Sequence, residues 1–287
     1  MKYFRAVVFS AACVLAPILA SAQEPTQQTA TPAPAPDMNE SDPDVRVDAL
    51  QPDFNLVALP TTLRMPLHKW AFRVTHRFTR ALGQGDVGDL ASDLFGLDSA
   101  AQVGLELRYG LASGTQLGVH RTSDRTIQIF GQHNFLNERR GDRAGLDLIA
   151  TLEGRNNLKQ QHQSALGLAL SKYVGRRASV YAEPLWVFNT NPAANAGSDN
   201  NTLMVGLGTR VRVRPSMYLT AEITPRLSGF EPGADQVSFA LEGRAGGHLF
   251  QLNVSNGFGT TLGQLAANGA FNNDNWYIGF NIARKFF

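Results

Sequence analysis

The chain has 287 residues, with 26 Lys and Arg against 24 Asp and Glu, and a mean hydropathy of -0.17. After the first twenty residues no apolar run reaches the length of a spanning helix. This excludes a helical membrane protein but not a membrane β-barrel, whose alternating strands average to neutral hydropathy. Cys13 is the only cysteine, so the residues after it offer no disulfide framework, thiolate metal site or cysteine nucleophile.

Residues 1–22 predict a secretory signal peptide. A basic start precedes an apolar run over residues 6–19, and Ala20-Ser21-Ala22 matches the small-residue pattern of a cleavage site. The run is shorter than the roughly 20 residues that a spanning helix needs. A retained anchor and lipidation at Cys13 are the less favoured alternatives.

Residues 23–53 predict a disordered, Pro-rich, acidic periplasmic linker. Residues 24–53 hold seven acids against one base, whereas residues 54–287 hold 23 bases against 17 acids. That basic excess is far below the dense patch of a nucleic-acid binder, so we expect no nucleic-acid partner. The acidic segment 24–53 leaves open a partner in the periplasm.

From Leu56 onward the dominant signal is a period of two, typical of strands with one oily face. In residues 203–213, for example, five aliphatic residues share one face while glycines, Met204, Arg210 and Arg212 share the other. Similar segments occur at residues 68–80, 101–110, 115–121, 126–135, 145–154, 164–174, 179–189, 202–214, 217–227, 237–245, 248–255 and 275–287.

These segments predict an all-β fold, a transmembrane antiparallel up-and-down β-barrel of about 12 strands over residues 54–287. Short and long connections alternate along the chain, apart from 122–125 and 136–144. Single-chain outer-membrane barrels show this alternation, with an even strand count and both termini in the periplasm. We therefore predict a location in the bacterial outer membrane, with the lipid bilayer as the principal partner.

The polar face distinguishes this barrel from a soluble β-sandwich or a lipocalin-like barrel. It is rich in Gly, Ser, Thr, Gln and Asn, with few lysines, as suits a lumen in which Arg and Glu side chains compensate each other. The charged candidates for the lumen are Arg73, Arg77, Arg108, Arg210, Arg212, Arg226 and Arg244, together with Glu106, Glu153, Glu183, Glu222 and Glu242. Either they form a neutralised network that rigidifies or plugs the barrel, or their arginine surplus favours small anions in a water-filled passage.

Aromatic residues near the strand ends predict girdles at the two membrane interfaces. The candidates are Trp70, Tyr109, Trp186, Trp276, Phe286 and Phe287. In the last strand, Phe286 shares the oily parity of Trp276, while Phe287 falls on the opposite parity. Either a bulge shifts the register or Phe286 is the outward anchor. This final aromatic strand also resembles the signal that the outer-membrane assembly machinery recognises.

Three stretches resemble a bacterial family of membrane-bound β-barrel proteins of unknown function, which are porin-like barrels of the outer membrane. They are residues 59–78, 94–126 and 246–259, and the most telling pieces are Thr75-His76-Arg77-Phe78, Phe95-Gly96-Leu97-Asp98-Ser99 and Gly246-Gly247-His248. The resemblance covers residues 56–287. It implies an outer-membrane barrel and brings no catalytic residues with it.

No catalytic, cofactor or metal site emerges from the motifs. His162-Gln163-Ser164 places a base and a hydroxyl on one strand face, as in outer-membrane phospholipases, but Ala165-Leu166 replaces the Asn-Gly that follows the serine there. The six histidines lack metal-ligand spacing, and no nucleotide-binding fingerprint is present.

We therefore predict an outer-membrane barrel without enzyme activity that forms a narrow channel for small anionic or polar solutes. One alternative is a non-conducting binding or assembly barrel that acts through its linker and the loops 81–100 and 256–274. The other, less favoured, is an outer-membrane lipid hydrolase.

Overall fold

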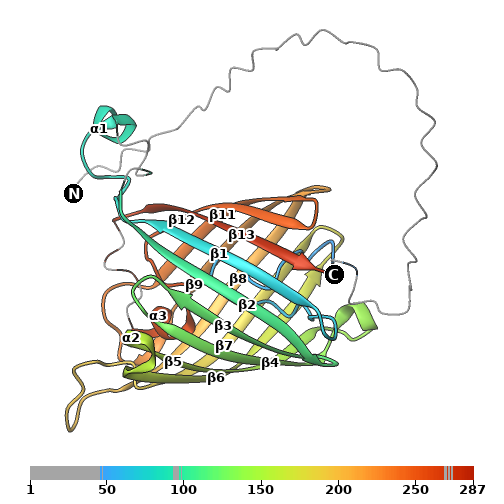
Figure 1. The fold of residues 1–287 in the computed structure, drawn as a ribbon, viewed down its shortest axis with the longest axis horizontal. Helices are drawn as coiled ribbons and strands as arrows, with labels where there is room; N and C mark the ends of the chain where they lie inside the picture. Colours follow the sequence, from blue (N-terminus) through green and yellow to red (C-terminus); the bar gives the residue numbers. More distant parts are fainter. Residues whose placement is uncertain are drawn as a thin grey trace, which may run out of the picture. The chain divides into compact units, whose positions relative to one another are not determined.

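Antiparallel strands close into one barrel in the computed structural model (Figure 1). The structure describes residues 46, 48–92, 97, 99–267, 270, 272 and 274–287. All of these belong to one compact unit, residues 40–287. The predicted signal peptide 1–22, residues 23–45 of the predicted linker, and Phe95, Gly96 and Asp98 of the family motif lie outside the described residues.

The strands agree closely with the segments of period two. They are β1 (Trp70–Phe78), β2 (Ala101–Ala112), β3 (Thr115–Thr122), β4 (Ile127–Leu136), β5 (Gly145–Gly154), β6 (Gln160–Val174), β7 (Ala178–Phe188), β8 (Asn201–Arg214), β9 (Met217–Thr224), β10 (Arg226–Gly229), β11 (Gln236–Ala245), β12 (His248–Ser255) and β13 (Tyr277–Phe286). The connections hold the short helices α1 (Val87–Ser92), α2 (Arg155–Leu158) and α3 (Leu262–Ala267), and a 3-10 turn at Glu138–Arg140. Among the described residues, every helix is too short or too polar to cross a membrane.

Pairing between β1 and β13 closes the ring. Every other strand pairs with its neighbour in the chain, except that β9 and β10 both pair with β8 while β11 pairs with β9. Pro225 interrupts the ladder between β9 and β10, because proline has no N–H to donate. The two strands both pair with β8, so together they fill one position in the barrel. The barrel therefore has twelve strand positions, as predicted.

Burial alternates along the strands in the sense expected of a membrane barrel. In β1, Trp70 and Phe72 are exposed on the outer face while Arg73, Thr75 and Arg77 are buried inside. Large aliphatic and aromatic side chains are likewise exposed along most other strands. A soluble barrel would place its apolar residues inside, so the outward apolar face favours the transmembrane barrel over its soluble rivals.

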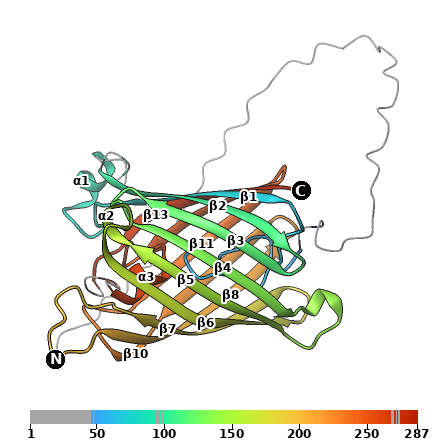
Figure 2. The ribbon, with the colours of Figure 1, turned by 60° about the horizontal axis from the view of Figure 1, so that its bottom comes forward.

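The two ends of the barrel differ in their connections. The turns after β2, β6, β8 and β11 are short and lie at the end where the C-terminus emerges, whereas α2 and α3 lie at the other end (Figure 2). Residues 136–144 are an exception to the alternation of short and long connections, as the sequence indicated, because the 3-10 turn lengthens the connection between β4 and β5. By the usual asymmetry of such barrels, the short turns mark the periplasmic end.

Candidate functional site

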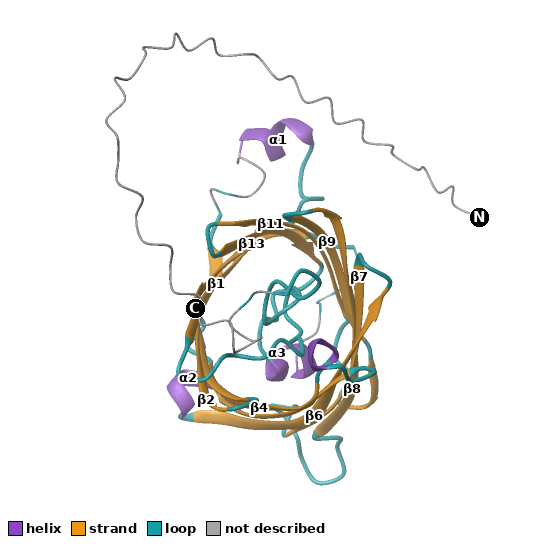
Figure 3. Ribbon diagram, turned by 90° about the vertical axis from the view of Figure 1, so that its right-hand side faces the viewer, coloured by secondary structure: helices purple, strands orange, loops and turns teal. Residues whose placement is uncertain are grey.

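A segment before β1 occupies the interior of the barrel. We call residues 48–66 the plug, because every residue from Gln51 to Pro66 is buried. Figure 3, which looks into the ring of strands, shows loops and α3 filling its interior. The composition-based prediction that the linker extends to residue 53 is therefore corrected for residues 48–53, whose polar side chains find partners on the barrel wall. Tyr173, for example, donates to Asp48.

The plug folds into a tight hairpin. Leu56 N donates to Leu59 O at 2.8 Å, and Thr61 N donates to Phe54 O at 2.7 Å. Pro60, opposite Asn55 in this hairpin, ends the apolar run from Leu56 to Leu59. This run belongs to the hairpin tip and not to a barrel strand, although the period-two signal appeared to begin there.

Glu222 of β9 binds the tip through the main chain. Its carboxylate accepts hydrogen bonds from three consecutive amides, Val57 N at 2.9 Å, Ala58 N at 2.9 and 3.0 Å, and Leu59 N at 3.1 Å. The carboxylate is only 4% exposed. Hydrogen bonds to a charged acceptor are stronger than neutral ones, so Glu222 is the principal anchor of the tip.

Carbonyl groups of the plug are bound by donors from the wall. Arg210 Nη2 donates to Asn55 O (2.7 Å), Gln251 Nε2 to Leu56 O (2.9 Å), Asn281 Nδ2 and Arg73 to Val57 O, Gln132 Nε2 to Thr61 O (2.6 Å), and Gln116 Nε2 to Leu63 O (3.3 Å). These contacts satisfy main-chain groups that burial would otherwise leave unpaired. The plug is thus held mainly by side chains of the wall and adds no strand to the sheet.

Two glycines of β8 make room for the leucines of the tip. A Cβ at Gly206 would lie 2.7 Å from Leu59 Cδ2, and one at Gly208 would lie 2.2 Å from Leu56 Cδ1. Leu56 and Leu59 join a buried cluster with apolar side chains of the wall and of α3, including Leu185. The small residues predicted on the lumen face therefore leave space that the plug fills.

Gly208→Leu is expected to loosen the plug, because the new side chain would occupy the volume of the Leu56 side chain. Overpacking of this kind costs about 1–3 kcal/mol. The rate of proteolysis within the plug, measured in detergent micelles, checks this prediction. The double variant Leu56→Ala/Gly208→Leu should return to the wild-type rate. Equal rates for the wild type and Gly208→Leu would contradict the close packing.

An ion pair fixes the start of the hairpin to the last strand. Lys285 Nζ lies 2.8 Å from Asp53 Oδ1, and both side chains are buried. Burial alone would raise the pKa of Asp53, but Lys285 and Arg73 outweigh it and hold the pKa of that carboxyl below its ordinary 3.8. Asp53 is therefore ionised while the plug is seated.

Asp53→Asn is expected to destabilise the protein at neutral pH by an amount that vanishes in acid. Because the folded-state pKa is lowered, the ionised pair stabilises the protein fully above the ordinary value of 3.8. That contribution is lost as the pH falls through the lowered pKa. The free energies of unfolding of wild type and variant, measured from pH 7 down to about pH 2.5, should converge. Asp199→Asn in an exposed loop is the control, and a wild-type-to-variant difference that does not change with pH would refute the pair's role.

A second segment enters the barrel from the opposite end. Residues 256–267, which include α3, are almost entirely buried. Gly263 N donates to Glu153 Oε2 at 3.1 Å, and Gln264 Nε2 donates to Asp124 Oδ2 at 3.2 Å. The prediction that the loop 256–274 is available to partners is therefore wrong for residues 256–267, because wall carboxylates and the apolar cluster hold them inside.

Little free space remains between the plug and α3. A cavity of about 30 Å³ is lined by plug residues Asn55 and Pro60, by Leu262 and by wall residues such as Arg108 and His120. This volume corresponds to roughly one water molecule. This cavity is therefore too small to hold a solute.

Ten of the twelve charged lumen candidates are buried inside. Arg210 pairs with Glu242 (Nε to Oε2, 2.8 Å), and Arg108 pairs with Glu106 (Nη2 to Oε1, 2.8 Å). The other buried candidates are Arg73, Arg77, Arg226, Glu153, Glu183 and Glu222. Among the described residues, the Glu183 carboxylate has no hydrogen-bond partner. Acids and bases thus occur in equal number among these ten residues.

Arg212 and Arg244 are less buried than these ten residues. Both are half-buried near the short-turn end of their strands. Arg212 Nε and Nη2 donate to Pro215 O in the turn, at 3.2 and 2.9 Å. Their parity is that of the lumen, but they lie beyond the depth at which the plug fills it.

The interface candidates lie toward both ends of the barrel. The rings of Trp70 and Tyr109 are in tilted contact near the short turns, with centroids 4.4 Å apart, whereas Trp186 and Trp276 lie toward the long loops. Phe286 is 51% exposed on the outer face. No bulge is recorded where β13 pairs with β1 or β12, so Phe286 is the outward side chain. Their membrane-interface role stays a prediction.

Phe287 is placed differently from the prediction. It packs against a cluster that includes Phe54 and Met65 of the plug and Ala71 of β1. The physical reason is its parity, which turns it inward like Lys285 two residues before.

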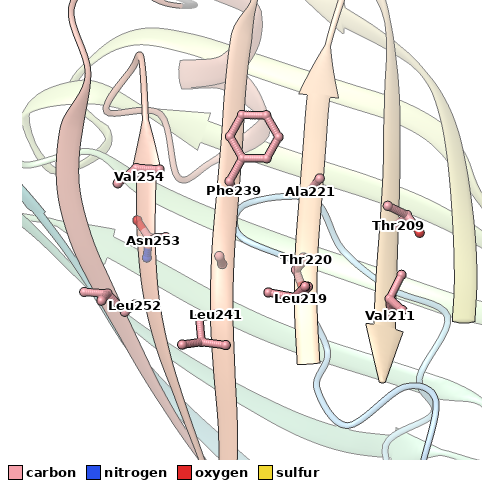
Figure 4. Close-up of a pocket in the computed structure, with 11 residues that line it drawn as sticks. Thr209, Val211, Leu219, Thr220, Ala221, Phe239, Leu241, Leu252, Asn253 and Val254 are labelled. Carbon is pink, nitrogen blue, oxygen red and sulfur yellow. The ribbon is translucent and has the colours of Figure 1, made fainter. Parts of the chain in front are cut away.

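An apolar groove of about 390 Å³ lies on the outer face of the barrel, between β8, β9, β11 and β12 (Figure 4). Phe239, Leu219 and Leu252 are exposed along it. It is therefore separate from the lumen, and it belongs to the surface that faces the bilayer.

The strand that carries His162 and Ser164 shows no hydrolase arrangement among the described residues. His162 Nε2 is bonded to Leu158 O at 2.8 Å. Ser164 pairs with Leu152 on β5 and Phe188 on β7, so its strand neighbours are apolar. Within the described ranges, no group of three or more His, Cys, Asp or Glu side chains is placed to hold a metal ion.

The plug is the functional feature that sequence reasoning missed. A signal for it existed in the wall itself, because apolar residues such as Leu185 and Met204 occur on the lumen parity of β7 and β8, where they are fully buried. Apolar side chains facing a water-filled passage would be unfavourable, so they indicate that something packs against them.

Comparison with known proteins agrees with this architecture. A family model described as membrane bound beta barrel domain (DUF5777) matches residues 53–286. No curated protein sequence matches the chain. A solved NanC porin is 8% identical at a TM-score of 0.52, over 76% of this chain and 100% of that one.

Two further solved structures are similar at lower scores. An outer-membrane channel from Pseudomonas putida F1 is 13% identical at a TM-score of 0.49, over 77% of this chain and 97% of that one. Omp33, an outer-membrane protein of Acinetobacter baumannii, is 10% identical at a TM-score of 0.45, over 76% and 98%. At 8% identity, the likeness to the NanC porin is one of fold alone.

Proposed function

Because the chain belongs to the family of membrane-bound β-barrel domains and lies in the bacterial outer membrane, we propose that it is a channel for small polar solutes held closed by its own plug. The observation that carries the proposal is the complete burial of residues 51–66 within the barrel. The plug adds no strand to the barrel, so its departure would break no strand pairing. A closed resting state and an open unplugged state are then available to one barrel.

The solute class follows from the charges that remain on the wall. The buried candidates include as many arginines as glutamates, and Gln, Asn, Thr and Ser fill much of the remaining lumen face. A wall of this kind provides hydrogen-bond donors and acceptors in place of a strong field of one sign. We therefore propose small polar solutes, without the preference for anions that the arginine surplus of the full candidate set favours.

A disulfide lock tests the proposal. Thr62 Oγ1 of the plug lies 2.5 Å from Ser171 Oγ of β6, so cysteines at both positions would place their sulfur atoms within bonding reach. Solute uptake into proteoliposomes should be abolished in oxidised Thr62→Cys/Ser171→Cys and should return to the wild-type level on reduction. Thr62→Cys alone is the control. Equal uptake in the oxidised and reduced states would show that solutes pass without plug movement, contrary to the proposal.

A non-conducting barrel is the second candidate, and the small remaining cavity favours it. It would act through its external loop 81–100, which holds α1, and through its N-terminal segment. If neither the reduced lock variant nor a variant with a weakened plug passes solutes, this candidate replaces the channel.

Two partner proposals accompany the function. The final strand β13, with Phe286 outward, is proposed to be read by the outer-membrane assembly machinery. The part of the acidic segment 24–53 that precedes the plug is proposed to bind a periplasmic partner, and its connection to the plug would make that partner a means of opening the barrel. Deleting residues 24–45 should abolish copurification of such a partner without changing the barrel's heat-dependent gel mobility.

A further inference from the structure

The wall recognises the tip of the plug by its main chain. Three consecutive amides, those of Val57, Ala58 and Leu59, donate to Glu222, and the carbonyls of Asn55, Leu56 and Val57 accept from wall side chains. Within residues 55–59, the one wall contact to a polar side chain of the tip is Arg108 Nη2 to Asn55 Oδ1 at 3.3 Å. Most of this recognition would be available to a different sequence in the same backbone conformation.

Different strands of the wall bind the amides and the carbonyls of the tip. Glu222 of β9 binds the amides, while Asn281 of β13 and Arg73 of β1 bind the carbonyl of Val57. In the strand order, β12 and β11 separate β9 from β13, so acceptor and donors approach the tip from different directions. Arg210 of β8, the strand beside β9, also donates to Asn55 O, so side chains from several strands hold the peptide groups of the tip.

The space around the tip limits which side chains fit. Gly206 and Gly208 lie beneath Leu59 and Leu56, and the surrounding cluster is apolar. Small or aliphatic side chains can be buried here, as those of Leu56 and Leu59 are.

We propose that the unplugged lumen binds short peptides with small or aliphatic side chains through their main chain, and that the plug is a built-in occupant of this peptide site. The inference rests on the proposed function, since the site becomes free only when the plug leaves. It makes peptides, in place of sugars or simple anions, the solute class of the open barrel.

A cut chain allows the test without refolding. Leu67 and His68 are exposed between the plug and β1, so a protease recognition sequence inserted there can be cleaved after the barrel has folded. Size-exclusion chromatography then removes the released fragment, and unchanged heat-dependent gel mobility verifies that the barrel is intact. The uncleaved chain, whose site is occupied, is the negative control.

The probes are three labelled compounds of similar size. They are a terminally blocked peptide of residues 55–60, a blocked peptide of the same composition in scrambled order, and a linear trisaccharide. Fluorescence anisotropy should show binding of both peptides to the cut barrel and no binding of the sugar. Glu222→Gln should weaken both peptides about tenfold, which corresponds to the loss of charge-assisted hydrogen bonds. Glu231→Gln in an exposed loop should change neither.

Three results would overturn the proposal. Binding of the native peptide alone would indicate recognition of side chains, and equal binding of the sugar would indicate a general polar site. A fragment that neither leaves nor exchanges against peptide would show that the site admits no other occupant. Peptide binding without solute uptake would support the peptide site and refute the channel. Solute uptake without peptide binding would support the channel and refute the peptide site.

Discussion

Glu222→Ala is expected to release the plug from the barrel. The substitution removes the shared acceptor of three buried amides, those of Val57, Ala58 and Leu59. A buried donor left unpaired costs about 1–3 kcal/mol, so the seated plug should be destabilised by about 3 kcal/mol or more. The expected result is fast proteolysis within residues 48–66 and a raised frequency of open events in planar bilayers. The rest of the barrel should keep its protease resistance.

The control is Glu231→Ala, which removes a carboxylate from an exposed loop and should leave both readings unchanged. Proteolysis of the plug at the wild-type rate in Glu222→Ala would mean that the main-chain contacts to Glu222 do not hold it. Fast proteolysis with no open events would support Glu222 as the anchor of the plug and would contradict the channel function.

Arg210→Met should lower the free energy of unfolding by about 3–5 kcal/mol. Both members of the Arg210–Glu242 pair are fully buried, and two hydrogen bonds of 2.8 and 3.0 Å join them. Removing the guanidinium leaves the Glu242 carboxylate without its compensating charge and removes a donor to Asn55 O. Urea denaturation of the folded barrel in detergent measures the effect.

Two comparisons sharpen this prediction. Arg210→Met/Glu242→Leu should recover most of the loss, because replacing both partners leaves no uncompensated charge. Arg212→Met, two residues along the same strand but half-buried at the turn, should cost less than about 1 kcal/mol. Equal losses in the free energy of unfolding at positions 210 and 212 would contradict the distinction between the barrel interior and its short-turn end.

The barrel could be predicted from the sequence because its signal is local. A period of two, repeated in short segments between turns, reports which residues face outward without knowledge of the rest of the chain. Only the break at Pro225, which divides one barrel position into β9 and β10, lay beyond this pattern. Strand ends agreed to within a few residues because Gly, Pro and Asn mark the turns.

The plug could not be predicted in this way because its contacts are not local. Leu56 and Leu59 are apolar and close to β1, so they resembled the beginning of a strand, and Asp53 resembled the acidic linker before it. Their partners, Gly206, Gly208 and Lys285, lie about 150 residues or more away in the chain. Position along the barrel axis was the second obstacle. The period of two assigns Arg210 and Arg212 to the same face of the strand, but it does not indicate which of them reaches the plug.

Cysteine cross-linking in intact outer membranes tests the central claim most directly. If the plug occupies the resting barrel, Thr62→Cys/Ser171→Cys should form a disulfide in most molecules before any purification. Thr62→Cys/Ser164→Cys, whose second cysteine lies on the same strand but on its outer face, should remain reduced. Abundant cross-linking in the first pair alone is the predicted result, and equal, low cross-linking in both pairs would contradict a plugged lumen.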